Sequence, residues 1–360
     1  MKSLIGFFII LFFPISIFAD GISLIEDSQN QLFVFDKGHF KQLEHNKSTK
    51  MHVGRNFAVY IDYLGNLKVY YDQKVTRISE SVEDFTATEN LITWKVANYL
   101  YVWQDGIKKE ISRDARMVRA KGEIIYFEDE YDNALKIYYQ HEVYLFAQNH
   151  YSLQTKALSV GRGSVAVKDG DDQLFVFVKG NMQVKKFTDE RIYFSAGSNG
   201  VLVKNVDYGE LQILSGSDVE TVEYFAPKWF KSVYSWMVWV DNAGNFNVYE
   251  DGNKQLLAYQ KPTLIDYSPK GLLYENGGQL YVYSHGREQF VCEHVPQNYA
   301  FFNDLFVYHT RQNQVEVVYK GSPKTVSAMP GVKFELHFDV INLYEGYQRK
   351  IFYQGNVYHL

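Results

Sequence analysis

Residues 32–38 read Leu-Phe-Val-Phe-Asp-Lys-Gly, and a phrase of this kind occurs ten times along the chain. It has an aliphatic residue, a spacer, Val or Ile, then usually an aromatic residue or Leu, and often a Gly three residues later. The copies begin at Leu32, Leu67, Leu100, Leu135, Leu174, Leu211, Phe246, Leu280, Val315 and, with a charged first residue, Arg349. Successive copies are 33 to 39 residues apart. A period this regular predicts a repeat architecture.

Each repeat has the pattern of a β-meander. Residues 58–61 form a β-prone run, Gly65 lies in a turn, and the phrase at 67–71 and the run at 75–79 form two more strands. A hydrophobic run, a Gly-containing turn and a second run are typical of a hairpin. Between the third strand and the next hairpin lies a variable segment with room for one more short strand. Examples are residues 82–89, 113–121, 191–197 and 262–268.

The turn after the phrase has its own signature. Gly occupies one fixed position of this turn in seven of the ten copies. A tight hairpin needs a positive φ there, which Gly adopts without steric strain. The other three copies have Gln73, His141 and Ser217 at this position, so we expect looser loops there.

Four short antiparallel strands per repeat resemble the blades of β-propeller proteins. The chain has 29 Tyr, 26 Phe and only 7 Pro, and it has no long helical stripe, so an all-β fold is expected. Ten copies leave three arrangements open: one ring approaching ten blades, two rings of about five blades, or copies outside a ring. The longest intervals favour a two-lobe split near residues 150–163. The absence of a Pro/Ser-rich linker there favours a single ring.

The ends of the repeat region bear on ring closure. The chain enters at the first strand of a hairpin, near residues 22–25, and ends on a third strand at 356–360. The variable fourth strand therefore occurs nine times between ten copies. We expect close termini and an incomplete first or last blade.

The first nineteen residues have the pattern of a signal peptide. Lys2 precedes the apolar run 4–13, Pro14 follows it, and Ala19 is a suitable small residue before a cut ahead of Asp20. We therefore expect an exported protein with propeller repeats over 20–360 and no membrane insertion after cleavage, in the periplasm, at the cell surface or secreted. The net charge of −5 contains no basic block and disfavours nucleic-acid binding. Cys292 is the only cysteine, so an intramolecular disulfide is excluded.

Two acidic turns could in principle attract a cation, around Asp129 and Asp132 and around Asp169 and Asp172. Acidic residues are also ordinary turn formers, because they accept backbone N–H groups. The chain contains no helical His-x-x-x-His pair, no Gly-x-Ser-x-Gly motif and no phosphate loop. Gly161-Arg162-Gly163 lacks the lysine of a phosphate loop and fits a flexible connection. We therefore expect no metal and no cofactor, and the catalytic residues, if any, are unknown.

The most distinctive local stretch is aromatic and lies at residues 224–236. The candidate partner-binding residues are Lys228, Trp229, Phe230, Tyr234 and Trp236. Such rings with a basic neighbour can anchor a protein or stack on sugars. The alternative is that they fill space between blades. Arg162 and Lys228 become candidates if a pocket forms beside them.

The repeats and the lack of a concentrated catalytic motif favour an exported, non-enzymatic binding or scaffold protein. It would hold a protein or a glycan on one propeller face. The alternative is an exported propeller enzyme acting on glycans, with acids converging near a central channel. The fold alone does not separate the two.

Overall fold

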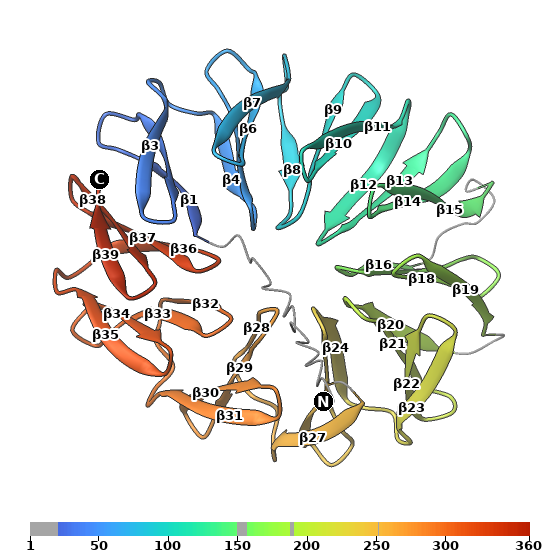
Figure 1. Cartoon of the computed structure of the whole chain (residues 1–360). Helices are drawn as coiled ribbons and strands as arrows, with labels where there is room; N and C mark the ends of the chain where they lie inside the picture. Colours follow the sequence, from blue (N-terminus) through green and yellow to red (C-terminus); the bar gives the residue numbers. More distant parts are fainter. Residues whose placement is uncertain (1–20, 150–156, 188–190, 251) are drawn as a thin grey trace, which may run out of the picture.

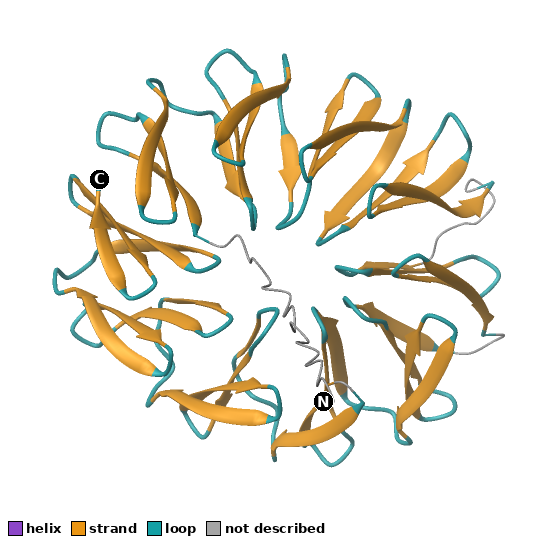
Figure 2. Cartoon of the chain, in the orientation of Figure 1, coloured by secondary structure: helices purple, strands orange, loops and turns teal. Residues whose placement is uncertain are grey.

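The computed structural model describes residues 21–149, 157–187, 191–250 and 252–360, so the predicted signal peptide lies outside the described part. The described residues form ten small antiparallel sheets arranged as the blades of one ring (Figure 1). Strands and connecting turns account for this part of the chain (Figure 2). The prediction of an all-β propeller with about ten blades is confirmed.

The strands follow one another blade by blade. Blades one to five comprise β1 (Ile22–Glu26), β2 (Leu32–Asp36), β3 (His39–Glu44); β4 (Lys50–Val53), β5 (Phe57–Ile61), β6 (Leu67–Tyr71), β7 (Lys74–Ser79); β8 (Phe85–Ala87), β9 (Ile92–Val96), β10 (Tyr99–Gln104), β11 (Ile107–Ser112); β12 (Ala115–Lys121), β13 (Ile124–Asp129), β14 (Ala134–Tyr139), β15 (Glu142–Gln148); and β16 (Ala157–Val160), β17 (Ser164–Lys168), β18 (Gln173–Val178), β19 (Asn181–Lys186).

The other half of the ring repeats this order. Blades six to ten comprise β20 (Ile192–Ala196), β21 (Val201–Asn205), β22 (Glu210–Ser215), β23 (Asp218–Glu223); β24 (Trp229–Val233), β25 (Trp236–Val240), β26 (Phe246–Glu250), β27 (Asn253–Ala258); β28 (Ile265–Tyr267), β29 (Leu272–Asn276), β30 (Gln279–Ser284), β31 (Arg287–Cys292); β32 (Tyr299–Phe302), β33 (Leu305–His309), β34 (Val315–Tyr319), β35 (Ser322–Ser327); and β36 (Lys333–His337), β37 (Val340–Glu345), β38 (Gln348–Tyr353), β39 (Asn356–His359).

The repeated phrase forms the same strand in every blade. It is β2 in the first blade, β6 in the second and β38 in the last, each paired on both sides. The variable segment forms the innermost strand of the next blade, as at β8, β12, β20 and β28. Both predictions are confirmed. The phrase therefore predicts the second strand from the outside of each blade.

The turns without the expected Gly differ from the prediction. Asp72 and Gln73 have φ of 49° and 60°, and Gln140 and His141 have φ of 46° and 66°. In the third case Gly216 takes the first turn position, with φ of 59°. All three turns join their strands through only two residues, so the expectation of looser loops was wrong. Polar residues can adopt the left-handed region at a cost of about 1–2 kcal/mol, which hairpin pairing offsets here.

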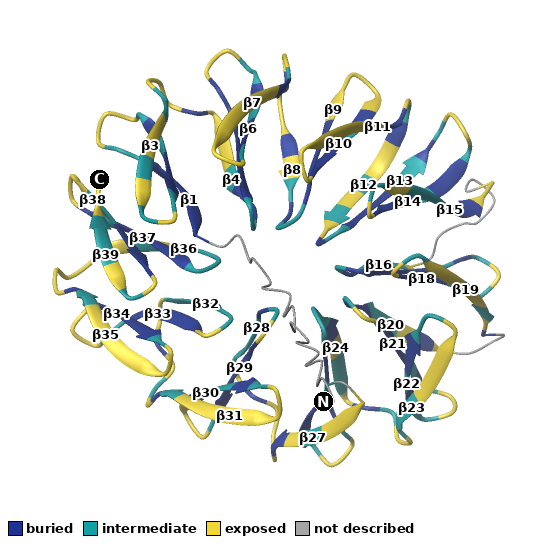
Figure 3. Cartoon of the chain, in the orientation of Figure 1, coloured by how far each residue is buried: buried dark blue, intermediate teal, exposed yellow. Residues whose placement is uncertain are grey.

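The core lies between neighbouring blades rather than at one centre. The two middle strands of each blade are largely buried, the outermost strands are largely exposed, and most residues of the innermost strands are half-buried or exposed (Figure 3). Between the second and third blades, for example, Phe57 packs edge-on against Trp103 with ring centroids 5.2 Å apart. A further cluster joins the fourth and fifth blades, on either side of residues 150–163, through Tyr139, Phe146 and Phe177. Apolar packing is therefore continuous across this part of the ring.

The first blade has three strands, β1 to β3, so the expected incomplete blade is the first one. Within the described residues this blade lacks the innermost strand, and β1 pairs with no strand on that side. Side chains of the last blade take over this role. Asn342 donates through Nδ2 to the Leu24 carbonyl at 2.8 Å and accepts from Ser23 Oγ at 2.8 Å. Arg349 Nε donates to the Glu26 carbonyl at 2.9 Å. We call the set of residues that make these contacts the seam: Ser23, Leu24, Glu26, Asn342 and Arg349.

Aromatic packing closes the rest of the seam interface. The Phe35 ring lies 5.7 Å from Tyr353 and 5.2 Å from Tyr358, measured between centroids. A Cβ atom on Gly21, the first described residue, would come within 2.7 Å of the Tyr353 hydroxyl. The first described residue therefore lies against the last blade, whose outermost strand β39 carries the C-terminus (Figure 1). The expected closure of the ring near its ends is confirmed.

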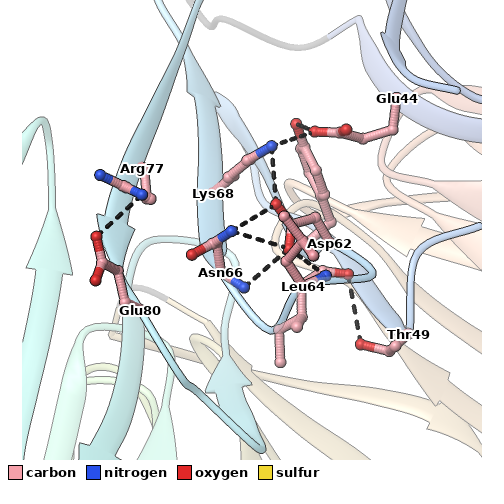
Figure 4. A network of polar contacts seen from close by, with 10 residues as sticks. Glu44, Thr49, Asp62, Leu64, Asn66, Lys68, Arg77 and Glu80 are labelled. Atoms are coloured by element: carbon pink, nitrogen blue, oxygen red, sulfur yellow. Dashed lines mark hydrogen bonds and ion pairs between the residues drawn. The ribbon is translucent and has the colours of Figure 1, made fainter. Parts of the chain in front are cut away.

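Polar networks fix the turns between second and third strands. Asp62 accepts the backbone N–H groups of Leu64 and Asn66, each at 2.9 Å, and pairs with Lys68 at 2.9 Å (Figure 4). Lys68 also contacts Glu44 at 2.6 Å. Burial alone would raise the pKa of Asp62, but the hydrogen bonds from Asn66 and Lys68 outweigh it and lower this pKa to about 2.

Candidate functional site

A cavity of about 460 Å³ lies where the loops between first and second strands meet at the ring centre, the region enclosed by the innermost strands. We call it the mouth. Loops from seven consecutive blades, the second to the eighth, contribute to its lining. Its charged and aromatic residues are Arg55, Glu89, Glu123, Arg162, Lys179, Tyr139 and Tyr234. Four further cavities in the described part of the chain are each lined by neighbouring blades only.

Arg162 is the central residue of the mouth. Its guanidinium is ion-paired with Glu89 of the third blade and donates to the Tyr234 hydroxyl of the seventh blade at 2.7 Å. The guanidinium carbon also lies 3.7 Å from the centre of the Tyr234 ring, a cation–π contact. Both ion-pair partners are largely buried, with side chains 21 % and 13 % exposed. Arg162 therefore links three non-adjacent blades at one point.

The glycines beside Arg162 explain how its loop reaches this position. A Cβ on Gly161 would lie 2.3 Å from the Gly197 carbonyl oxygen, and one on Gly163 would lie 2.4 Å from the Ser198 carbonyl oxygen. Gly163 N–H donates to the Gly197 carbonyl at 3.2 Å. Only Gly permits this close backbone approach. The segment that fits a flexible connection in the sequence is thus a packed turn that places Arg162.

Several charged groups at the mouth have no protein partner. Among the described residues, the side chains of Arg55, Lys179 and Glu123 make no hydrogen bond or ion pair, and Arg162 Nε is buried without an acceptor. Burial raises the pKa of Glu123, and nearby Arg55 and Lys179 partly offset this effect. Burial also lowers the pKa of Arg162, with Arg55 adding to the effect. Of these groups, Arg162 Nε is fully buried, Arg55 and Glu123 are half-buried, and Lys179 is exposed.

The five predicted partner-binding residues are distributed over different environments. Trp236 is buried and donates through Nε1 to the Ser268 carbonyl at 2.6 Å, and Phe230 packs on a core cluster that contains Trp239. Trp229 is half-buried, and Lys261 Nζ lies over it, 4.7 Å from the centre of the Trp229 ring.

The remaining two candidates, Lys228 and Tyr234, differ in their position relative to the mouth. Lys228 is exposed and does not line the mouth. Tyr234 does line it, so the structure brings Tyr234 together with Arg162. The partner-binding role of all five residues stays a prediction.

Sequence reasoning did not single out Arg55, Glu89, Glu123 or Lys179. Three of them lie in loops between a first and a second strand, and Lys179 lies in the turn between β18 and β19. The sequence did contain a signal for the first three, because several repeats carry a charged residue in the loop between the first and the second strand. Their convergence depends on ring closure, which brings blades far apart in sequence to one cavity.

The other sequence candidates are engaged within the fold. Lys136 is ion-paired with Asp129 at 2.9 Å and with Asp132, while Asp169 accepts the backbone N–H groups of Asp171 and Gln173. Within the described ranges, no three His, Cys, Asp or Glu side chains come together as metal ligands would.

The single cysteine, Cys292, lies at the end of β31. It is buried, and its Sγ lies 3.7 Å from His294 Nδ1.

The sequence matches the family model of the 10-bladed beta propeller domain over residues 16–358. The chain belongs to this family. The match agrees with the ten sheets of the structure and with the inclusion of all ten copies of the phrase in one ring. A comparison with curated proteins gave no match.

Solved structures show weak similarity to this 10-bladed propeller. The computationally designed Ika8 protein is 14 % identical, with 74 % of this chain and 94 % of that chain covered and a TM-score of 0.31. PorZ, described as a surface component of the type-IX secretion system of Porphyromonas gingivalis, is 10 % identical, with 95 % and 59 % covered and a TM-score of 0.27. Prp20p from Saccharomyces cerevisiae is 11 % identical, with 64 % and 81 % covered and a TM-score of 0.31. The family assignment rests on the family model.

A search of the described residues for a helix long and apolar enough to cross a membrane found none.

Proposed function

We propose that this 10-bladed propeller is an exported, non-enzymatic binding or scaffold protein that holds a partner at the mouth. The observation that carries the proposal is the set of unpaired charged groups around Arg162, in a cavity built by loops of seven blades. Arg162 Nε, Arg55 and Glu123 lose all or part of their hydration without gaining a protein partner, and a bound ligand would compensate them, with the exposed Lys179 beside them.

The geometry suits recognition of a charged group of the partner. Arg162 is held in one orientation by Glu89 and Tyr234, so little side-chain freedom is lost on binding. Arg55 and Lys179 supply two more cations, and Glu123 supplies a carboxyl group that can accept or donate a hydrogen bond. Recognition sites commonly combine a fixed Arg with flanking charges of this kind.

One observation favours the alternative, an exported enzyme acting on glycans. Burial raises the pKa of Glu123, as a general acid requires, and a second carboxylate, Glu89, lines the same cavity. However, the carboxylate that would act as nucleophile or base is Glu89, and it is already ion-paired with Arg162. We therefore place binding before catalysis.

The proposal is tested by capture from the cell envelope of the source cells. The wild-type protein and an Arg162→Gln variant are used as bait, with Lys74→Gln, on the outer strand β7, as a charge-matched control. We expect a retained partner that is lost with Arg162→Gln and kept with Lys74→Gln. Equal capture by all three proteins would overturn the proposal.

A parallel screen on polysaccharides tests the enzyme. Turnover of any glycan that is abolished by Glu123→Gln, with the partner capture unchanged, would establish the alternative. Since Glu123→Gln keeps the size of the side chain, loss of activity cannot be ascribed to a cavity.

A further inference from the structure

One innermost strand differs from the others. β12 has seven residues, whereas the other innermost strands have three to five. Arg116, Met117, Arg119 and Lys121 on this strand are all exposed, and Lys121 is adjacent to the loop of the mouth that contains Glu123. β12 therefore extends from the mouth along the ring centre with three basic side chains in contact with solvent.

The ring centre is basic although the chain as a whole is acidic. The nine innermost strands contain Lys50, Arg116, Arg119, Lys121, Lys231 and Lys333 against Asp266 and Glu335, in a chain of net charge −5. Lys50 is paired with Asp84 and Arg116 lies 3.6 Å from Glu130. In the described part of the chain, Arg119, Lys121 and Lys231 have no acidic side chain within ion-pair distance.

The charges of two of these cations, Lys121 and Lys231, act on one another. The Lys121 side chain is exposed but partly desolvated, which lowers its pKa, and the charge of Lys231 lowers this pKa further. Lys121 belongs to the fourth blade and Lys231 to the seventh, so two blades separate them along the ring. Asp266 also acts on Lys231 but lies beyond ion-pair distance. Like charges that act on one another are unfavourable, and an anion bound beside them would relieve the repulsion.

The backbone of β12 is irregular at the centre of this basic strand. The register with β13 shifts between Arg116 and Arg119, and Met117 has a φ of 47°. A long side chain rarely adopts this conformation, and a bulge redirects the side chains around it. Strain of this kind is found preferentially at functional positions. Met117 is 51 % exposed and offers an adaptable apolar contact beside the cations.

Resting on the proposed function, we infer that the ligand of the mouth is an acidic, extended protein segment that lies along β12. β12 is the terminal strand of its sheet, so its open edge can pair with an extended peptide. Arg119, Lys121 and Lys231 then match acidic side chains of that segment. A sugar chain fits less well, because at the mouth Tyr139 is buried and the Tyr234 ring is covered by Arg162, which leaves these two rings unavailable for stacking.

The test measures binding of the purified full chain to poly-L-glutamate, poly-L-glutamine and polygalacturonate by calorimetry at low salt. We expect binding to poly-L-glutamate that weakens as salt is added, and none to poly-L-glutamine. The variant Arg119→Gln/Lys121→Gln should bind poly-L-glutamate roughly tenfold more weakly, since each exposed ion pair contributes up to about 1 kcal/mol. The control Arg287→Gln/Lys74→Gln removes the same charges from the outer strands β31 and β7 and should bind like the wild type.

Three results would overturn the inference. The first is equal binding of poly-L-glutamate by the double variant and the wild type. If the double variant also self-associates, the charges protect an edge strand and do not bind a ligand. The second is tighter binding of polygalacturonate than of poly-L-glutamate, which would indicate an acidic glycan. The third is no binding of either polyanion. In that case, a partner captured through Arg162 from the cell envelope would still support the proposed function.

Discussion

The seam and the mouth are both polar regions formed by residues far apart in sequence, but they treat their polar groups in opposite ways. At the seam, Ser23, Asn342 and the Leu24 carbonyl satisfy one another, and the two side chains are fully buried. At the mouth, Arg55, Lys179, Glu123 and Arg162 Nε have no partner among the described residues. The first arrangement stabilises the ring, and the second is available for binding.

The seam also differs from the other blade junctions. At the remaining junctions an innermost strand contributes to the packing. In the first blade, as far as residues 21–360 describe it, Asn342 and Arg349 contact the backbone of β1 at the position that such a strand takes elsewhere. Hydrogen bonds from a few side chains therefore replace the backbone hydrogen bonds that an innermost strand would make to β1. Substitutions at these side chains should cost more stability than substitutions of the unpartnered charges at the mouth.

The largest effect is expected for Asn342→Ala. This change leaves the buried Ser23 hydroxyl and the Leu24 carbonyl without partners, which costs about 2–4 kcal/mol of unfolding free energy. Urea denaturation measures the loss, with Asn199→Ala in an exposed loop of the mouth as control. Equal destabilisation by the two variants would remove the distinction between seam and mouth.

Arg162→Gln should have an intermediate effect on stability and a large one on binding. It leaves the largely buried Glu89 without its cation, a loss of about 1–3 kcal/mol. Arg162→Lys keeps the charge but not the planar contact with Tyr234, and should recover only part of the loss. Unfolding of both variants is compared with their capture of the partner. A fully stable Arg162→Gln protein would show that the cluster contributes nothing to the fold.

The network of Asp62 provides a titratable counterpart to the seam. Its pKa of about 2 lies below the usual value of an aspartate, so the folded state favours the ionised carboxylate. The resulting stability is complete above about pH 4, the pKa of the unfolded chain, and is lost as the pH falls towards about 2. Asp62→Asn should therefore flatten the acid dependence of unfolding between about pH 4 and pH 2. An unchanged acid profile would exclude Asp62 as its source.

The smallest effect is expected for Arg55→Gln and Lys179→Gln. Neither side chain has a partner in the described part of the chain, so each change should alter stability by less than about 0.5 kcal/mol. Thermal unfolding provides the measurement. A loss comparable to that of Asn342→Ala would mean that these charges serve the fold rather than a ligand.

The sequence by itself determined the strands, most of the turns and the ten repeats, but it left open whether all ten copies form one ring. The phrase alternates apolar residues with period two, and this pattern is local, so β6 and its counterparts could be located without coordinates. Counting strands predicted an incomplete first or last blade, and the described residues show that it is the first. The tight turns at Gln73 and His141 did not follow, because hairpin pairing outweighs the local preference for Gly.

Only the tertiary structure decided which residues form the site. Closing the ring places Glu89, Arg162 and Tyr234, up to 145 positions apart in the chain, around one cavity. The same closure buries Trp236 and leaves Lys228 away from the mouth, although both belong to one aromatic stretch. Periodicity specifies which side of a strand is buried, whereas proximity between blades depends on how many blades the ring contains and where the seam lies. The repeat therefore predicts the blades, and ring closure determines the mouth.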